Sequence, residues 1–273
     1  MDEPLTPKEY TPALPLKSTF IALNALKDYL EVNLARELLL TRVPTPLFIL
    51  PDDNVPRQIA DALKKWSTGA LKSYGFTENE GLYIGVQAVI PAETADSVPC
   101  AHLSEWHWEK IVPKADLSLH TLKQAVKKIY KVIKMCEKYL SGLYPALQPQ
   151  LPDEIAFITK QELSSLYPDS TADEQAAFIS RRHKAVFIIN AAGNGDLSGD
   201  MMFYHPPLGL PLKISRAEVR PGTTGLPCTV GGALNRSLIC MFMLRKQHIG
   251  EVQPADWPDD TLEDCRDLGI KLL

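Results

Sequence analysis

This chain has few cysteines, no excess of positive charge and no long apolar run, and each of these features argues against a class of protein. The five cysteines are odd in number and scattered, with no C-x-x-C pair, which argues against a disulfide framework and a cysteine zinc site. A formal net charge of -4 gives no support for nucleic-acid binding through bulk electrostatics. No stretch approaches the roughly 20 apolar residues of a membrane-spanning helix, and the N-terminus shows no secretory signal. We therefore expect a cytoplasmic protein without a membrane or nucleic-acid partner.

Hydrophobic periodicity predicts an α+β fold. Proline-rich residues 1–15 are expected to form a flexible N-terminal arm, and residues 16–273 a single domain, because no repeat or linker interrupts them. Helical spacing favours helices over 16–34, 56–68, 122–140 and 231–245, with a capped helix after Ser170 or Thr171. Strands are predicted at 82–90, 100–112, 155–158, 185–189, 201–204 and 212–219, and a strand or extended loop at 47–50. This pattern is typical of a mostly antiparallel sheet flanked by helices.

The aromatic strand predicted at 100–112 carries candidate catalytic residues. Glu105, His107 and Glu109 alternate with Trp106 and Trp108, so the two sets should lie on opposite faces of the strand. His107 beside two carboxylates is a candidate general base, because the ordinary pKa of histidine suits proton transfer near neutrality. The alternative is a histidine that a neighbouring group simply satisfies. For the two tryptophans we expect core packing.

Three motifs carry a family resemblance. They are Glu80-Gly81-Leu82-Tyr83, the Glu105–Glu109 segment, and Gly231-Gly232 followed by residues 233–253. With these motifs the chain resembles the ammonia-dependent asparagine synthetase family (aspartate–ammonia ligase, A type), over nearly its whole length. The resemblance implies a class II aminoacyl-tRNA synthetase-like catalytic domain, a homodimer, and a small amino acid as substrate. It also implies the use of ATP and Mg²⁺ to activate a carboxylate that ammonia then captures.

The same resemblance implies a set of substrate-binding residues. Lys65 corresponds to a family lysine that would neutralise a substrate carboxylate, although a lysine on a helix is also commonly just solvated. Asp200 is the best surviving acid of a family loop that residues 190–200 replace in shortened form; a glycine-rich hairpin is the alternative there. Gly231 and Gly232 permit close approach of backbone to a ligand, or serve helix–sheet packing. Arg236 is a candidate only if the helix starts differently from our prediction.

Several positions depart from the family pattern. Ile90 and Leu238 stand where arginines would hold ATP, and Lys213 stands where the family has a glutamate. Arg216 and Glu218 occupy small-residue positions. These departures weaken the case for ATP and Mg²⁺, and we predict no metal ligand. Three functions stay open: an amide-forming ligase, a repurposed ATP-independent enzyme acting on an amino-acid-derived molecule, and a non-catalytic binding or regulatory protein. A diverged enzyme of the ligase type is the interpretation that we favour.

The lysine-rich face of the predicted helix at 122–140 offers an RNA-binding alternative. Its six lysines recur on one side of the helix, as they do on an ordinary solvated amphipathic face. Because the whole chain is acidic, we take this face as solvated.

Overall fold

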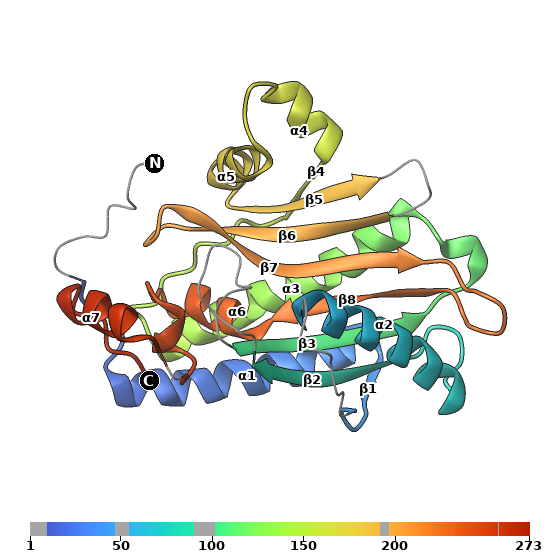
Figure 1. The fold of residues 1–273 in the computed structure, drawn as a ribbon, viewed down its shortest axis with the longest axis horizontal. Helices are drawn as coiled ribbons and strands as arrows, with labels where there is room; N and C mark the ends of the chain where they lie inside the picture. The colour runs from blue at the N-terminus through green and yellow to red at the C-terminus, as the bar shows by residue number, and fades with distance from the viewer. Residues whose placement is uncertain (1–9, 47–54, 90–101, 192–196, 256) are drawn as a thin grey trace.

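A mixed sheet occupies the middle of the structure (Figure 1). In this computed structural model the described residues are 10–46, 55–89, 102–191, 197–255 and 257–273. Within them the sheet has eight strands in the order β1-β2-β3-β8-β7-β6-β5-β4. The strands are β1 (Leu40–Arg42), β2 (Gly81–Val89), β3 (His102–Ile111), β4 (Ala156–Thr159), β5 (Ala185–Ala191), β6 (Leu197–His205), β7 (Leu210–Arg220) and β8 (Thr229–Asn235). Only the two outer pairs, β1 with β2 and β4 with β5, are parallel, so the predicted α+β fold with a mostly antiparallel sheet is confirmed.

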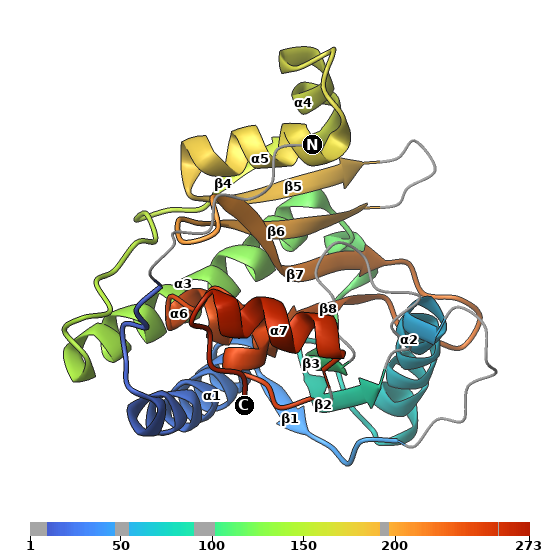
Figure 2. The ribbon, with the colours of Figure 1, turned by 60° about the vertical axis from the view of Figure 1, so that its left-hand side comes forward.

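Helices cover the two faces of this sheet unequally (Figures 1 and 2). The helices are α1 (Leu16–Leu38), α2 (Val55–Ser73), α3 (Leu119–Leu143), α4 (Lys160–Leu166), α5 (Ala172–His183), α6 (Arg236–Met243) and α7 (Asp259–Asp267), with short 3₁₀ turns at Lys114–Asp116 and Ile249–Glu251. The face that carries Trp106 and Trp108, here called the back face, packs with α1, α3 and α6 around the largest apolar core. The opposite or front face is covered over β2 and β3 by α2, through Leu63 and Leu71. Among the helices of the described segments, none is long and apolar enough to cross a membrane.

Most of the predicted elements are present. The stripes predicted at 16–34, 56–68 and 122–140 become α1, α2 and α3, each a little longer than expected. Thr171 caps α5 in a capping box with Glu174. The motif segment 80–83 runs into β2 and the aromatic segment forms β3. The prediction for 47–50 lies outside the described residues.

The helix predicted over 231–245 is wrong in its first third. Residues 229–235 continue the sheet as β8, between β3 and β7, and helix α6 begins only at Arg236. Asn235 caps that helix, its side-chain oxygen accepting a hydrogen bond of 2.9 Å from the backbone N–H of Leu238. The glycine pair therefore lies inside a central strand and does not open a helix.

The described end of the predicted arm is packed against the domain. Residues 1–9 lie outside the described residues, but Leu14 is buried in the main core. Tyr10 donates a hydrogen bond of 2.9 Å to the buried carboxylate of Glu251 near the C-terminus. These contacts anchor the chain before α1 begins.

Candidate functional site

Ionic side chains gather on the front face, at the centre of the sheet. In strand β3 the side chains of Glu105, His107 and Glu109 lie on this face, whereas Trp106 and Trp108 are buried on the back, as the alternation predicts. Residues paired directly across neighbouring strands share a face. Register therefore adds Gly231 and Ala233 of β8, Arg216, Glu218 and Arg220 of β7, and Asp200 of β6 to the front face.

Glu109 is saturated with partners from within the protein. Its carboxylate is fully buried and accepts hydrogen bonds from the hydroxyls of Thr68 (2.6 Å), Thr229 (2.8 Å) and Ser67. The Nη1 atom of Arg220 lies 3.0 Å from its Oε1. An ionised carboxylate offers about four acceptor positions, so little capacity is left for a ligand or metal.

His107 lies beneath α2 as a neutral imidazole. Burial, assisted by the positive charges of Arg220 and Lys64, lowers its pKa to about 3. Its Nε2 is 3.2 Å from the hydroxyl of Ser67, whose own hydrogen goes to Glu109. At 4% exposure the ring has little access to solvent. A pKa so far below neutrality makes the imidazole a weak proton acceptor, so the environment does not favour the predicted general base, and the catalytic role stays a prediction.

Helix α2 brings a lysine to the front face, and it is Lys64. The Nζ of Lys64 lies 2.9 Å from the carboxylate of Glu218, which also lies 3.3 Å from Nη2 of Arg220. Burial raises the pKa of Glu218, but the charges of Arg220 and Lys64 outweigh burial and hold it below its usual value. The predicted substrate lysine, Lys65, is instead exposed on the outer side of the helix.

Asp200 is also paired within the protein. Its Oδ1 lies 3.0 Å from Nζ of Lys213, and the two side chains are 28% and 52% exposed. Lys213 reaches back to Asp200 because a β-bulge interrupts the pairing of β6 with β7 beside it. Asp200 is thus on the front face, as the less exposed member of an ion pair.

Two opposite charges on the front face, Glu105 and Arg216, form no close ion pair with the described residues, although Lys213 acts on Glu105 and Arg216 on Glu218 at longer range. Neither Glu105 nor Arg216 has a hydrogen bond or an ion pair within 4 Å among the described residues. Arg216 is exposed and Glu105 is partly buried; burial raises the pKa of Glu105, and the nearby Lys213 opposes this effect. They lie on β7 and β3, on either side of β8, so their backbones are about 10 Å apart across the strands. Glu105 lies opposite Asn235 and Arg216 opposite Ala233, so long side chains from both strands can contact one small ligand above this part of β8.

The two glycines of β8 are explained by strand packing. A Cβ on Gly232 would lie 2.0 Å from the backbone oxygen of Arg216, and one on Gly231 would lie 2.9 Å from the backbone oxygen of Trp108. Both distances are too short for a real side chain. Packing therefore accounts for both glycines, and their ligand-binding role stays a prediction.

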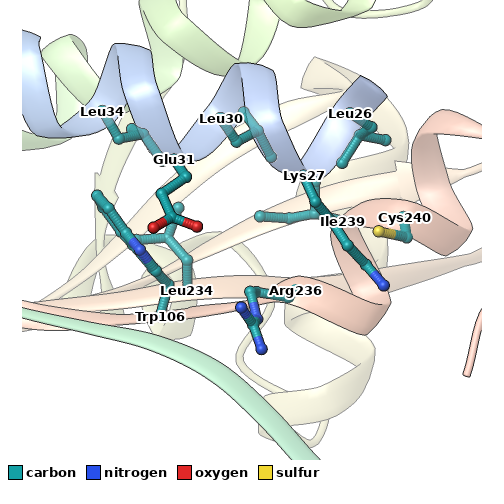
Figure 3. Close-up of a pocket in the computed structure, with 10 residues that line it drawn as sticks. All are labelled: Leu26, Lys27, Leu30, Glu31, Leu34, Trp106, Leu234, Arg236, Ile239 and Cys240. Atoms are coloured by element: carbon teal, nitrogen blue, oxygen red, sulfur yellow. The ribbon is translucent and has the colours of Figure 1, made fainter. Parts of the chain in front are cut away.

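Arg236 lies on the back face, away from the other predicted site residues. Its Nε donates to the hydroxyl of Ser104 at 3.3 Å, and its guanidinium is next to Gly85. Figure 3 shows it at a narrow, mainly apolar cavity beneath α1, together with Glu31 and Trp106. The physical reason is the late start of α6: Arg236 follows the last residue of β8 and points back towards α1. The structure does not bring Arg236 together with Glu105 or Asp200.

The donor set of the front face does not fit Mg²⁺. No group of three or more histidine, cysteine, aspartate or glutamate side chains is arranged for a metal within the described segments. Glu109 is occupied, and Glu218 and Asp200 each contact an ammonium group that would repel a cation. We therefore assign no step to a magnesium ion. Ile90, at one expected phosphate-binding position, lies outside the described residues.

Sequence reasoning missed the polar residues that hold α2 to the sheet. A helix turns about 100° per residue, so Lys64 and Ser67 fall within about 100° of Leu63, whereas Lys65 falls about 200° away. The apolar stripe of α2 was therefore the signal that points to Lys64. Thr229 and Arg220 carry no such signal, because their contacts to Glu109 span more than a hundred residues.

Comparison with known proteins identifies the family to which this chain is similar. The sequence profile described as "Aspartate-ammonia ligase" matches residues 51–196 and 222–269. The stretch between them contains β6 and β7, the strands of Asp200, Lys213 and Arg216.

Full-length relatives agree with this match. The chain is 35% identical to an aspartate–ammonia ligase of Ruminiclostridium cellulolyticum over 336 aligned positions and to one of Clostridium perfringens over 338, with all of both chains covered in each case. Both alignments are longer than this chain of 273 residues, so the relatives carry stretches that it lacks.

Solved structures show the fold. Asparaginyl-tRNA synthetase of Pyrococcus horikoshii, complexed with asparaginyl-adenylate, superposes with a TM-score of 0.64 at 10% identity, covering 89% of this chain and 70% of that one. The enzyme of Entamoeba histolytica gives 0.61 at 12% identity, covering 87% of this chain and 66% of that one. The fold is thus that of class II aminoacyl-tRNA synthetases, and the chain belongs to the aspartate–ammonia ligase family.

Proposed function

We propose that this protein is a diverged carbon–nitrogen ligase of the aspartate–ammonia type, with residues 16–273 as its catalytic domain. In this proposal it binds a small amino acid on the front face and forms an amide at the amino-acid carboxylate. The observation that carries the proposal is a pair of opposite charges without an ion pair within 4 Å among the described residues: Glu105, opposite Asn235 of β8, and Arg216, opposite Ala233 of β8. A zwitterion matches them directly: its ammonium meets Glu105 and its carboxylate meets the Arg216 guanidinium.

Each charge has a defined part in this proposal. Arg216 offers a planar fork of donors that holds a carboxylate in a fixed orientation. Glu105 anchors the amino end and, because burial raises its pKa, also accepts a proton more readily than an ordinary carboxylate. The resemblance implies ATP as the source of activation, but no step is routed through it here, because the residues around Glu109 do not fit its metal.

Titration calorimetry tests the binding half of this proposal. L-Aspartate, L-asparagine and L-glutamine are titrated into the wild-type protein and into Glu105→Gln and Arg216→Gln. Loss of one charge-assisted contact is expected to weaken binding by about tenfold or more. Lys127→Gln on α3 and Glu263→Gln on α7 are matched controls, since both side chains are exposed. Unchanged affinity in both site variants would contradict the assignment of the site.

A product assay tests the chemical half. The wild-type protein is incubated with an amino acid, ¹⁵N-ammonium, ATP and MgCl₂, and the labelled amide is measured by mass spectrometry. Time-dependent product that Arg216→Gln diminishes supports the ligase. Amino-acid binding without product would reject the ligase and favour the second candidate, a non-catalytic amino-acid-binding protein. The engagement of Glu109 by Ser67, Thr68, Thr229 and Arg220 is the observation that favours this second candidate.

We further propose that the protein is a homodimer that uses the outer surface of α1 and α3. Large apolar side chains on this surface are 41–55% exposed: Phe20, Ile21 and Val32 on α1, and Met135, Tyr139 and Leu143 on α3. Tyr29 and Tyr139 stack with ring centroids 5.0 Å apart, which joins the two groups. Contiguous exposed apolar surface of this kind commonly marks an interface. Light scattering should give a dimer mass for the wild type and a monomer mass for Val32→Glu; a wild-type monomer would reject the proposal.

We also propose a cytoplasmic location. The four described cysteines, Cys136, Cys228, Cys240 and Cys265, are all free, as a reducing compartment would keep them. Fractionation of cells that express the full chain is the direct measurement.

A further inference from the structure

The cavity on the back face combines an apolar lining with two basic side chains. It lies between α1, the back of the sheet and α6, so the sheet separates it from the charges of the front face (Figure 3). The space is narrow and measures about 370 Å³ including its mouth. Its apolar lining is buried and consists of Leu26, Leu30, Leu34, Leu234, Ile239 and Cys240. A volume of this size lies at the lower end of the range of small-molecule sites.

The two cations of the cavity are not neutralised by the protein. Among the described residues, Lys27 makes no hydrogen bond or ion pair, and Arg236 uses only its Nε, on the hydroxyl of Ser104. Figure 3 shows Lys27 extending from α1 to the side of the cavity where the guanidinium of Arg236 lies. Burial raises the pKa of Cys240 to about 11, and the charges of Lys27 and Arg236 both oppose this effect. Both positive charges therefore act inside the cavity.

The other polar groups of the lining do not oppose an anion. Glu31 is already engaged, since Nη1 of Arg42 lies 3.1 Å from its carboxylate and the hydroxyl of Tyr83 donates to it at 3.1 Å. Trp106 is 3% exposed, and its indole Nε1 has no hydrogen-bond partner among the described residues. A buried indole N–H usually finds an acceptor, so this donor is available to an oxygen atom of a ligand.

From these observations we propose that the back-face cavity binds an unbranched aliphatic carboxylate. Its hydrocarbon tail lies among the leucines of α1, and its carboxylate lies between Lys27 and Arg236. A narrow apolar slot favours a slim tail over a branched or bulky one, and two uncompensated cations favour an anionic head group. Arg236 makes the larger contribution, because its guanidinium is less exposed than the amino group of Lys27 and offers a fork of donors.

Titration calorimetry on the full-length protein tests this site with three probes. Octanoate carries both tail and charge, octylammonium has the same tail with the opposite charge, and acetate has the charge without the tail. Octanoate is expected to bind at one molecule per chain, about tenfold or more tightly than either of the others. Arg236→Gln should weaken octanoate binding by about tenfold, and Lys27→Gln by about two- to fivefold. Lys17→Gln is the matched control, because Lys17 is exposed on the same helix outside the cavity lining.

Nuclear magnetic resonance of the tryptophan indole groups locates the bound molecule. The chain has four tryptophans, and the indole signal that disappears in Trp106→Phe belongs to Trp106. This signal should shift on addition of octanoate. Octanoate binding that leaves it unmoved would overturn the proposal, because the tail would lie elsewhere.

Three further outcomes would also overturn the inference. Octylammonium that binds as tightly as octanoate would show that the two cations do not select the ligand. Equal octanoate affinity of wild type and Arg236→Gln, with thermal melting showing that the variant is folded, would reject the assigned anion site. If a second copy of the chain covers the cavity instead, octanoate should not bind, and Arg236→Gln should change the mass measured by light scattering. None of these results depends on an amino acid binding to the front face.

Discussion

Replacing Arg220 by methionine should destabilise the protein strongly, because Glu109 would then be a buried carboxylate without its counter-charge. The guanidinium Nη1 lies 3.0 Å from Oε1 of Glu109, whose side chain is 0% exposed, while that of Arg220 is 17% exposed. At an effective dielectric constant of about 20, charges at this distance attract by about 5 kcal/mol. Removing one partner of a buried pair typically costs about 3–5 kcal/mol.

Three hydroxyl groups reduce the loss of stability that we expect for Arg220→Met. Ser67, Thr68 and Thr229 still donate to Glu109 when Arg220 is absent, so we expect about 3 kcal/mol, the lower end of that range. At about 2–4 °C per kcal/mol for a domain of this size, the melting temperature should fall by roughly 6–12 °C. Urea unfolding followed by circular dichroism measures the free energy. Arg181→Met is the matched control, since Arg181 is exposed on α5 and its loss should cost less than about 0.5 kcal/mol.

A double-mutant cycle with Glu109→Gln separates this ion pair from general packing effects. The glutamine side chain of that variant would keep an acceptor oxygen for the threonines but carry no charge, so removing Arg220 should then cost about 1 kcal/mol or less. If the single changes at Arg220 and Glu109 instead add within about 0.5 kcal/mol, the two groups are not coupled and the reasoning is refuted. A loss below about 1 kcal/mol in Arg220→Met alone would refute it as well.

Three further predictions concern the same sheet. His107 is neutral in the folded protein, where its pKa is about 3 against an ordinary value of 6.5. Between these two pH values the unfolded chain therefore binds more protons than the folded protein, and the stability falls as the pH falls. This residue should contribute about 2 kcal/mol of the loss between pH 7 and pH 5, and His107→Gln should reduce the loss measured in urea titrations. Gly232→Ala should cost more than about 3 kcal/mol through overlap with the neighbouring strand, whereas Gly142→Ala in α3, whose Cβ would meet nothing within 4 Å, should stabilise by about 0.5–1 kcal/mol. Calorimetry with ATP and MgCl₂ should show no micromolar, Mg²⁺-dependent binding, since Glu109 is already saturated.

The sequence predicts the outer helices and the aromatic strand well, because each has a single buried face. In α3, residues from Leu122 to Leu140 recur at helical spacing and are buried, so periodicity alone locates the helix. In β3, the tryptophans alternate with ionic residues at the two-residue period of a strand. Both signals depend only on the nearest neighbours along the chain.

Strand β8 shows why local pattern fails at the centre of the sheet. It is mostly buried, so its residues do not alternate between polar and apolar. Leu234 also stands four residues before Leu238, a spacing that fits a helix equally well. Gly232 takes its role from the backbone of β7, a contact that spans the turn between the strands and that periodicity cannot reveal.

The sequence predicts which residue types lie at the candidate site, but not which charged side chains form ion pairs with each other. Glu105, His107 and Glu109 share one face, as the alternation in the strand predicts, yet nothing local indicates that Lys213 pairs with Asp200 while Glu105 has no close ion pair among the described residues. Ion pairs depend on which strands are neighbours and on single-residue features such as the bulge in β7. Long-range pairing of this kind can be determined only once the register of the sheet is known.

The family profile and the outer ion pair of the front face involve different parts of this chain. The segments that match the profile contain β2, β3, β8 and α6, which form the centre of the sheet and part of its back-face core. Asp200, Lys213 and Arg216 stand on β6 and β7, which the profile does not match although the full-length relatives align across them. A sheet places little constraint on the charge of its exposed side chains, so the charges on these two strands can change while the fold is maintained.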